Sequence, residues 1–276
     1  MTTYLNYQNN PAKLAEAFDE LTFWASRFGA LLFDNLQLRP NLRILDIGCA
    51  TGFPLFELAQ VHGPSSQVTG IDIWQEALPR ALTKKRNYEQ ENVTILGADA
   101  AFLPFADTTF DLIVSNLGIN NFADPQASLA ECYRVASSHA RLVLTTNLMG
   151  HMVEFYAVYR QTLTDLDLSH LTPQLNAQEA RRGTVASVSM LLNQSGFRVT
   201  RTVENSFKMR VLNSDALFNH HLIKIGFLDG WRGFLPPEQE QSVFQSLQTA
   251  LDKLASTKGE LTLTIPMLYI EAEKQS

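Results

Sequence analysis

Short apolar runs alternate with segments of helical periodicity between residues 42 and 148. Runs of this kind form strands that are buried on both faces of a sheet, and the segments between them form crossover helices. The expected strands lie at 43–47, 67–72, 93–96, 110–115 and 141–146, and the expected helices at 54–61, 76–88 and 124–135. This order predicts a doubly wound, mostly parallel, Rossmann-like α/β sheet with right-handed crossovers.

Outside this stretch the pattern is helical but less regular. Residues 12–38 carry apolar side chains at helical spacing, among them Leu21, which predicts one N-terminal helix or two helices broken near Gly29. An alternating segment at 261–269 contains Pro266, which suits an edge region or a strand interrupted at the proline. The remaining expected elements are an irregular helical stretch at 148–182, helices at 184–195, 214–228 and 237–256, and a strand at 197–203.

We expect these elements to form one domain over residues 1–276, because the sequence contains neither a repeat nor a low-complexity linker. The α/β core would occupy about residues 40–148. Helical cap elements would lie above the carboxyl edge of the sheet, where ligands bind in this architecture. They are expected at about residues 10–38, 150–182 and 206–258.

Composition narrows the class of protein. Hydrophobic residues make up 45% of the chain and charged residues 18%, so the chain can bury a full core. The net charge of −6 argues against a nucleic-acid-binding surface, because phosphate contacts need clustered Lys and Arg. Cys49 and Cys132 lack CxxC partners, so we expect neither a disulfide framework nor a metal site. The start of the chain lacks a signal-peptide pattern, and no apolar run approaches the roughly 20 residues that span a bilayer, which predicts a cytoplasmic protein without a membrane span.

The strongest chemical signal is the loop after the first expected strand, which reads LDIGCATGFP over residues 45–54. Small residues let backbone N–H groups approach a ligand, and the N-terminus of the following helix favours negative charge. The dinucleotide fingerprint G-x-G-x-x-G is absent, because Ala50 and Phe53 stand where it needs glycine. A plain tight turn between strand and helix is the alternative explanation for this loop taken alone.

Two aspartates follow the next two expected strands. Asp72 comes 20 residues after Gly52 (72 − 52), and a carboxylate there can accept hydrogen bonds from both hydroxyls of a ribose. The alternative role is an N-cap for the segment that starts at Trp74. Asp99 precedes an apolar stretch that ends at Phe105. Its carboxylate can accept from an exocyclic amine while apolar side chains sandwich a purine, and an ordinary polar turn is the alternative.

Together the loop, Asp72, the 97–105 segment and the strand with its following residues at 110–116 resemble the class I S-adenosylmethionine-dependent methyltransferases. The similarity is to the broad methyltransferase type 11 group that includes the ubiquinone and menaquinone C-methyltransferases, and it extends over residues 42–148. The chain departs from the family pattern at Ala50, where the family usually has glycine, and at residues 137–140, where a Pro-Gly-Gly turn is common.

This resemblance implies S-adenosyl-L-methionine as cofactor and suggests a role for each matching residue. Asp46 would lie near the amino group of the methionine part, Asp72 would hold the ribose, and Asn116 would lie close to the methionine end. Asp99 would accept from the adenine amine. The other implied contacts are Gly48, Cys49 and Gly52 beside the methionine part, Ile73 packed on adenine, and the Ala100 N–H on its ring nitrogen.

The implied activity is methyl transfer to a small, partly apolar acceptor, with carbon, oxygen and nitrogen acceptors all open. An in-line displacement needs alignment and exclusion of water, and it needs a base only if the acceptor must lose a proton. His151, His220 and His221 are candidate bases, because histidine titrates near neutral pH. Each is otherwise a histidine satisfied by a backbone carbonyl or by solvent. The alternatives are a nicotinamide-dependent oxidoreductase, which the missing glycines oppose, and a non-catalytic S-adenosylmethionine-binding regulatory protein.

Overall fold

The computed structural model describes residues 3–18 and 22–275. Contacts divide the chain into two compact units, each assembled from separate stretches of sequence. The sheet unit comprises Asn10–Thr146, Thr184–Asn205 and Met267–Ser276, and the helical unit comprises Met1–Asn9, Asn147–Gly183 and Ser206–Pro266. The expected cap stretches at 150–182 and 206–258 fall in the helical unit, whereas 10–38 falls in the sheet unit. That the two units act as one domain stays a prediction.

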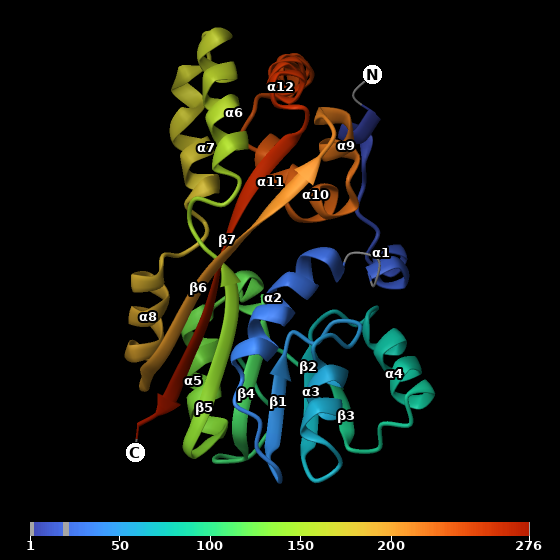
Figure 1. Ribbon diagram of the computed structural model, residues 1–276, viewed down its shortest axis with the longest axis vertical. Coiled ribbons are helices and arrows are strands. Elements are labelled where there is room, and N and C mark those ends of the chain that lie inside the picture. Colours follow the sequence, from blue (N-terminus) through green and yellow to red (C-terminus); the bar gives the residue numbers. More distant parts are fainter. Residues whose placement is uncertain (1–2, 19–21, 276) are drawn as a thin grey trace. The chain divides into compact units, whose positions relative to one another are not determined.

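Seven strands form one sheet in the order β3-β2-β1-β4-β5-β7-β6 (Figure 1). Their bounds are β1 Arg43–Ile47, β2 Gln67–Asp72, β3 Val93–Gly97, β4 Phe110–Asn116, β5 Ala136–Asn147, β6 Phe197–Val211 and β7 Leu261–Lys274. The pairs β2–β3, β1–β2, β1–β4 and β4–β5 are all parallel. The predicted α/β class with a mostly parallel sheet is therefore confirmed.

The central strands are buried for the reason that their composition predicts. In β1 and β4 every side chain except those of Arg43 and Asp111 is buried, and the apolar Ile44, Leu45 and Leu112 are fully covered. Strands buried on both faces need this near-continuous apolar sequence, because helices cover both faces of a parallel sheet. The register pairs Asp46 with Gly70, and the strands therefore bring their carboxyl ends to one edge.

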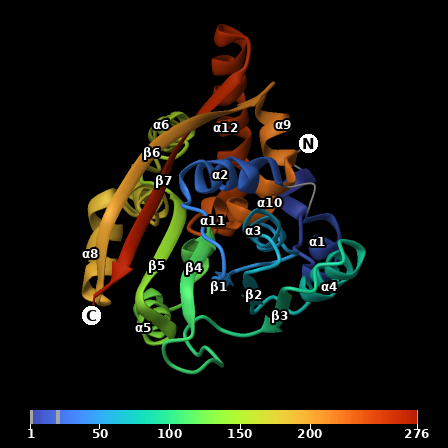
Figure 2. The same ribbon diagram turned by 60° about the horizontal axis from the view of Figure 1, so that its bottom comes forward.

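The helices of the sheet unit are α1 Pro11–Ala17, α2 Thr22–Asn35, α3 Leu55–His62, α4 Leu78–Asn87, α5 Pro125–Val135 and α8 Val185–Gln194. Of these, α1, α5 and α8 begin at a side-chain cap. Helix α3 contacts β2 and β3, α4 contacts β3, and α2 contacts β4 (Figure 2). The side chain of Asp124 accepts from the Ala127 N–H at 2.9 Å, and Thr184 forms a capping box with Ser187. These caps satisfy N–H groups that the first helical turn leaves without partners.

The N-terminal helical region differs from the expectation of a break near Gly29. Helix α2 continues through Gly29, and α1 ends at Ala17. Gly29 instead makes room for the ring of Phe53, since a Cβ added there would lie 2.3 Å from the nearest ring carbon. Leu21, part of the expected apolar stripe, lies outside the described residues.

The last three strands are longer than the sequence pattern indicated. Strand β5 begins at Ala136 and includes residues 137–140, with His139 at a positive φ of 60° and a register shift in the pairing with β4. Strand β7 lies between β5 and β6 and runs unbroken through Pro266, so the expected edge position and the expected interruption are both wrong. Proline removes only a backbone donor. The Pro266 carbonyl still accepts from the Leu148 N–H at 3.1 Å.

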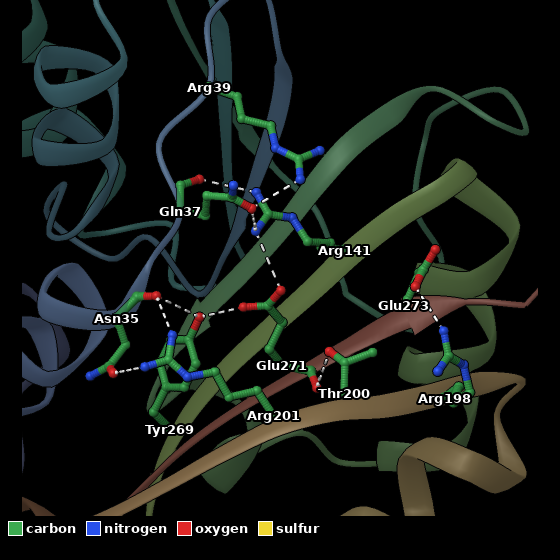
Figure 3. A network of polar contacts seen from close by, with 10 residues as sticks. All are labelled: Asn35, Gln37, Arg39, Arg141, Arg198, Thr200, Arg201, Tyr269, Glu271 and Glu273. Atoms are coloured by element: carbon green, nitrogen blue, oxygen red, sulfur yellow. Dashed lines mark hydrogen bonds and ion pairs between the residues drawn. The ribbon is translucent and has the colours of Figure 1, made fainter.

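A polar network ties β5, β6 and β7 to the C-terminal end of α2 (Figure 3). Arg141 donates to the Gln37 carbonyl at 3.0 Å and pairs with Glu271 at 3.3 Å. The Tyr269 hydroxyl donates to Glu271 at 2.8 Å, and Arg201 donates to the Asn35 side chain at 2.6 Å. The charged ends of the central Arg141–Glu271 pair are largely buried, at 11% and 13% exposure, so these bonds are shielded from water.

The helical unit is held together by aromatic side chains. Its elements are η1 Thr3–Asn6, α6 Val153–Asp165, η4 Ser169–Leu171, α7 Thr172–Glu179, α9 Ser214–Asn219, α10 His221–Gly226, α11 Leu228–Arg232 and α12 Pro237–Lys258. Phe155 stacks on Trp231 with ring centroids 4.0 Å apart, and Tyr4 stacks on Phe218 at 4.8 Å. Across the described ranges, no helix combines the length and apolar character needed to cross a membrane.

The single helix expected at 214–228 is replaced by three short ones. His220 is extended, with φ −64° and ψ 128°, and its Nδ1 accepts from the Leu222 N–H at 3.3 Å. It therefore ends α9 and caps α10. Helical spacing continues across this break, which is why the periodicity did not reveal it.

Candidate functional site

The loop between β1 and α3 is folded so tightly that three of its residues adopt positive φ. Gly48, Ala50 and Gly52 have φ of 84°, 43° and 113°. The loop N–H groups of Gly48 and Cys49 both donate to the Ile71 carbonyl of the neighbouring strand, at 2.9 and 3.0 Å. At Gly52 a Cβ would lie 2.2 Å from the Phe56 ring, so only glycine fits this position.

Ala50 accepts the left-handed conformation that the family pattern assigns to glycine. This conformation is costly for a residue with a Cβ, but alanine is the smallest such residue. The Ala50 N–H donates to Asp72 Oδ2 at 2.8 Å, which fixes this peptide. The substitution therefore leaves the loop compact and bound to the end of β2.

Asp72 connects the glycine loop to the segment after β2. Its Oδ1 accepts from the Trp74 N–H at 2.8 Å, as the capping alternative predicts, although α4 begins only at Leu78. Its Oδ2 accepts from Ala50. A carboxylate can accept about four hydrogen bonds, so two backbone bonds leave capacity for two hydroxyl donors. Asp72 remains partly exposed.

Asp46 is a completely buried acid with no partner for its carboxyl group. Its side chain is 0% exposed, and neither Oδ1 nor Oδ2 has a hydrogen-bond partner among the described residues. Burial raises the pKa of Asp46 well above its usual value, and the charge of Asp72 raises it further. The same two causes, burial and then the charges of Asp46 and Asp72, raise the pKa of the Cys49 thiol. A carboxyl group of this kind needs a donor or a cation to offset its desolvation.

The end of β3 offers a second part of the site. Asp99 is exposed, and its Oδ1 accepts from the Ala101 N–H at 2.9 Å, the contact of an ordinary polar turn. Two large apolar side chains of the segments after β2 and β3 are exposed, Ile73 at 65% and Phe102 at 78%. Ala100 is buried. Exposed side chains of this size can cover the two faces of a planar ring.

The segment after Asp99 is held by one arginine of α5. Arg134 donates to the carbonyls of Leu103 and Phe105 at 2.9 and 2.7 Å. Its guanidinium also pairs with Glu131 through two bonds of 2.7 Å, and Glu131 accepts from the Leu103 N–H. The hydrogen bonds from Arg134 lower the pKa of Glu131. This bidentate pair fixes the backbone next to the Asp99 turn.

Asn116 uses its side chain for structure. Its Oδ1 accepts from the Thr145 hydroxyl at 2.6 Å, and its Nδ2 donates to the Ala25 carbonyl at 3.4 Å. The neighbouring Ser115 hydroxyl donates to the Ile47 carbonyl at 2.7 Å, beside the start of the glycine loop. Asn116 thus joins β4, β5 and α2, and a role at the methionine end stays a prediction.

The three candidate bases lie in the helical unit and have different surroundings. His220 caps α10, and burial lowers its pKa. His221 is exposed at the start of α10. His151 is 2% exposed, and its pKa is lowered to about 4 by burial and by the charge of Arg182. Within residues 3–18 and 22–275, no group of three His, Cys, Asp or Glu side chains could hold a metal ion.

Comparison with known proteins identifies the family of this chain. Residues 38–204 match the family described as "Methyltransferase domain", which is more than half of the chain. The chain belongs to this family. The predicted membership of the class I methyltransferases is confirmed, and the matched residues include every element from β1 to α8.

Curated relatives agree with this assignment, and solved structures share the fold. The demethylmenaquinone methyltransferase of Anoxybacillus flavithermus is 32% identical over 129 residues, which are 45% of this chain and 54% of the relative. The chain thus matches about half the length of such curated relatives. A SAM-dependent methyltransferase from Aquifex aeolicus has the same fold with a TM-score of 0.53 at 21% identity, over 71% of this chain and 93% of that one. The [4+2]-cyclase SpnF also has this fold, with a TM-score of 0.56 at 17% identity, over 90% of this chain and 80% of that one.

Several functional features of this methyltransferase-family protein were not found from its sequence. The Arg134–Glu131 pair was missed although the sequence contains a signal for it, because the two residues lie three apart on the expected helix at 124–135. The contact of Asp72 with Ala50 has no such signal, since nothing in the sequence marks which backbone N–H a carboxylate will bind. Arg182, half-buried in the helical unit, also carried no signal.

Proposed function

We propose that the protein transfers a methyl group from S-adenosylmethionine to a small, partly apolar acceptor, which is methylated at carbon, nitrogen or oxygen. Family membership supports the reaction class. The glycine loop, Asp46 and Asp72 support the cofactor, because all three lie at the carboxyl ends of the adjacent strands β1 and β2.

The observation that carries this proposal is the buried carboxyl group of Asp46 beside the loop. Asp46 is buried without a partner and Asp72 lies near enough to raise its pKa. A buried carboxyl group without a donor does not suit a pyrophosphate, which brings only acceptors and negative charge to such a loop. The ammonium of S-adenosylmethionine would supply both donors and a positive charge, which favours the ionised form of this carboxyl group. This argues for a methyl donor and against a nicotinamide cofactor.

The residues of the site fit the parts of this cofactor. The carboxyl group of Asp46 would accept from the ammonium, and the free acceptor capacity of Asp72 would serve the two ribose hydroxyls. Ile73 and Phe102 would cover the adenine ring, and the Asp99 carboxylate would accept from its amine. When bound, the cofactor supplies an electrophilic methyl group. The chain's task is then to align that methyl with the acceptor and to exclude water.

Two features support a small-molecule acceptor. The net charge of −6 opposes a nucleic acid, because phosphate binding needs clustered cations. The helical unit contains many aromatic side chains, such as Phe155 and Trp231, which suit a partly apolar ligand.

The first experiment measures cofactor binding by calorimetry. Asp72→Ala should weaken the binding of S-adenosylmethionine by roughly 1.5–3 kcal/mol, the value for hydrogen bonds to a charged group. Asp111→Ala is a matched control, because Asp111 also accepts from a backbone N–H, that of Arg43, at 2.8 Å, but lies at the start of β4. Equal losses in both variants, or tighter binding of NAD than of S-adenosylmethionine by the wild type, would contradict the proposal.

The second experiment measures the reaction itself, because a fold does not determine its chemistry. The protein is incubated with methyl-labelled S-adenosylmethionine and a panel of small phenols, quinols, amines and carboxylic acids. Label in a small product supports the proposal. Cofactor binding without turnover on any acceptor would favour a regulatory protein, and label in RNA or DNA would exclude a small acceptor.

A further inference from the structure

The helical unit buries two side-chain nitrogens that have no hydrogen-bond partner among the described residues. They are Nδ1 of His151, in the turn before α6, and Nε of Arg182, after α7. Most buried polar atoms in proteins have a partner, so each exception needs an explanation. The two residues belong to segments that lie side by side, because the Met149 N–H, two residues before His151, donates to the carbonyl of Gly183, which follows Arg182, at 2.9 Å.

Tyr156 brings a third polar group to the same place. Its ring lies edge-on to His151, with centroids 5.6 Å apart. The charges of Glu179 and of Arg182 act on its hydroxyl in opposite directions. The Tyr156 oxygen accepts from the Trp231 indole N–H at 3.1 Å. A phenol has one proton of its own to donate, so this hydroxyl can still serve as a donor.

Aromatic rings surround these polar groups. His151 lies 6.0 Å from the ring of Phe227, and Phe227 lies 5.6 Å from Trp231, with the two planes inclined by 32°. Trp231 is 1% exposed. Flat apolar walls with a few convergent donors are typical of sites for planar ligands.

No acid of the described residues pairs with Arg182, and Glu179, whose charge also acts on Tyr156, is paired with Arg160 at 2.6 Å. Burial lowers its pKa, and the charge of the neighbouring Arg181 lowers it further. Among the ion pairs of the described residues, none includes Arg182. A guanidinium stays charged in proteins, and Arg182 is half-buried with its Nε covered, so part of this charge is taken out of water without a partner. An anion is the ligand that would remove this cost.

We propose that the helical unit binds a small planar aryl oxyanion, a carboxylate or phenolate, at Arg182, His151 and Tyr156. The guanidinium would pair with the oxyanion, the Tyr156 hydroxyl and His151 would complete its hydrogen bonds, and Phe227 and Trp231 would contact the ring. As the substrate class of the methyl transfer, this ligand rests on the proposed function. The binding of the aryl oxyanion itself does not depend on the proposed function, because every residue involved belongs to the helical unit.

The test is calorimetric titration of the full chain with benzoate, 4-hydroxybenzoate and benzamide. Arg182→Gln should weaken benzoate binding by about tenfold or more, as the loss of a charged hydrogen bond does. Arg181→Gln is the matched control, since the Arg181 side chain is exposed and donates to Gln178 at 3.2 Å, and it should change the affinity by less than about twofold. Benzamide, the uncharged analogue, should bind the wild type about tenfold more weakly than benzoate.

Arg182→Lys covers the case in which the glutamine variant does not fold, because it keeps the charge and loses the Nε–H. It should retain part of the benzoate affinity. Equal affinities in the Arg181 and Arg182 variants, equal binding of benzamide and benzoate, or no benzoate binding by a wild type that binds S-adenosylmethionine would each overturn the inference and leave the proposed function standing. If the wild type bound benzoate in an Arg182-dependent way but did not bind S-adenosylmethionine, the inference would stand and the proposed function would be overturned.

Discussion

The sheet unit and the helical unit each contain an ionisable side chain with buried polar atoms that lack a partner among the described residues, but one side chain is an acid and the other is a base. In the sheet unit it is the carboxyl group of Asp46, and in the helical unit it is the guanidinium of Arg182 beside His151. Such groups reduce the stability of the free protein, and they are retained most readily where a ligand satisfies them. The contrast indicates a cationic ligand for the sheet unit and an anionic ligand for the helical unit.

The two units also differ in what holds them together. Parallel backbone pairing fixes the sheet unit, with Asp46 opposite Gly70 and Ile47 opposite Ile71. The helical unit depends on long-range aromatic contacts, such as Tyr4 against Phe218. In the helical unit, a substitution of a buried polar side chain should therefore change the free energy of unfolding through side-chain packing and solvation.

The largest expected effect concerns His151 and pH. Its pKa is lowered to about 4 in the folded protein, first by burial and then by the charge of Arg182. As pH falls below 6.5, the unfolded chain binds a proton at His151 while the folded protein does not. The free energy of unfolding is therefore highest above pH 6.5 and decreases as pH falls toward 4. The loss amounts to about 3 kcal/mol. His151→Phe keeps the ring contacts and should flatten the dependence of the unfolding free energy on pH between 7.5 and 4.5.

Urea unfolding at these two pH values measures the effect. The control is His170→Phe, which removes an exposed imidazole of the same unit. If both variants flattened the pH dependence equally, the burial of His151 could not be its cause.

A smaller effect is expected in the network of Figure 3, which belongs to the sheet unit. Glu271→Ala leaves Arg141 largely buried without its ion partner and removes an acceptor of Tyr269. It should lower the unfolding free energy by about 2 kcal/mol, less than for a fully buried pair. Glu273→Ala breaks the pair with Arg198, whose side chain is 61% exposed, and should cost less than about 1 kcal/mol. If denaturant unfolding gave the same loss of free energy for Glu271→Ala and Glu273→Ala, burial of the Arg141–Glu271 pair would not contribute to its effect on stability.

The sequence predicted the sheet unit well because its signals are local. The run at 43–47 gave β1 with its bounds, and Asp124-Pro125 marked the start of α5. The position of Asp72 at the end of β2 followed from the same pattern, because parallel strands end at one edge.

The features that were missed depend on contacts between distant residues. Gly29 continues α2 because Phe53 packs on it, and His220 breaks the helix at 214–228 because its side chain caps the next one. Neither event changes the helical spacing of apolar residues. Arg182 likewise resembles any surface arginine until the fold buries its Nε.

The smallest expected effect separates the stability of the sheet unit from its proposed ligand. Because burial raises the pKa of Asp46, the folded protein holds a proton that the unfolded chain releases, and stability falls as pH rises above the usual aspartate range. Asp46→Asn removes this ionisation. At pH 8 the free variant should be more stable than the wild type by about 1 kcal/mol, since its amide also lacks partners.

The same variant should bind S-adenosylmethionine about tenfold more weakly, because the ammonium loses its carboxylate. Methylthioadenosine lacks the amino-acid part and should bind both proteins equally. Denaturant unfolding and calorimetry measure the two effects side by side. A variant that is less stable than the wild type at pH 8, or that loses affinity for both ligands alike, would place the cationic group of the ligand away from Asp46. A gain in stability together with a selective loss of S-adenosylmethionine would show that this buried acid is kept for its ligand, at a cost to the free protein.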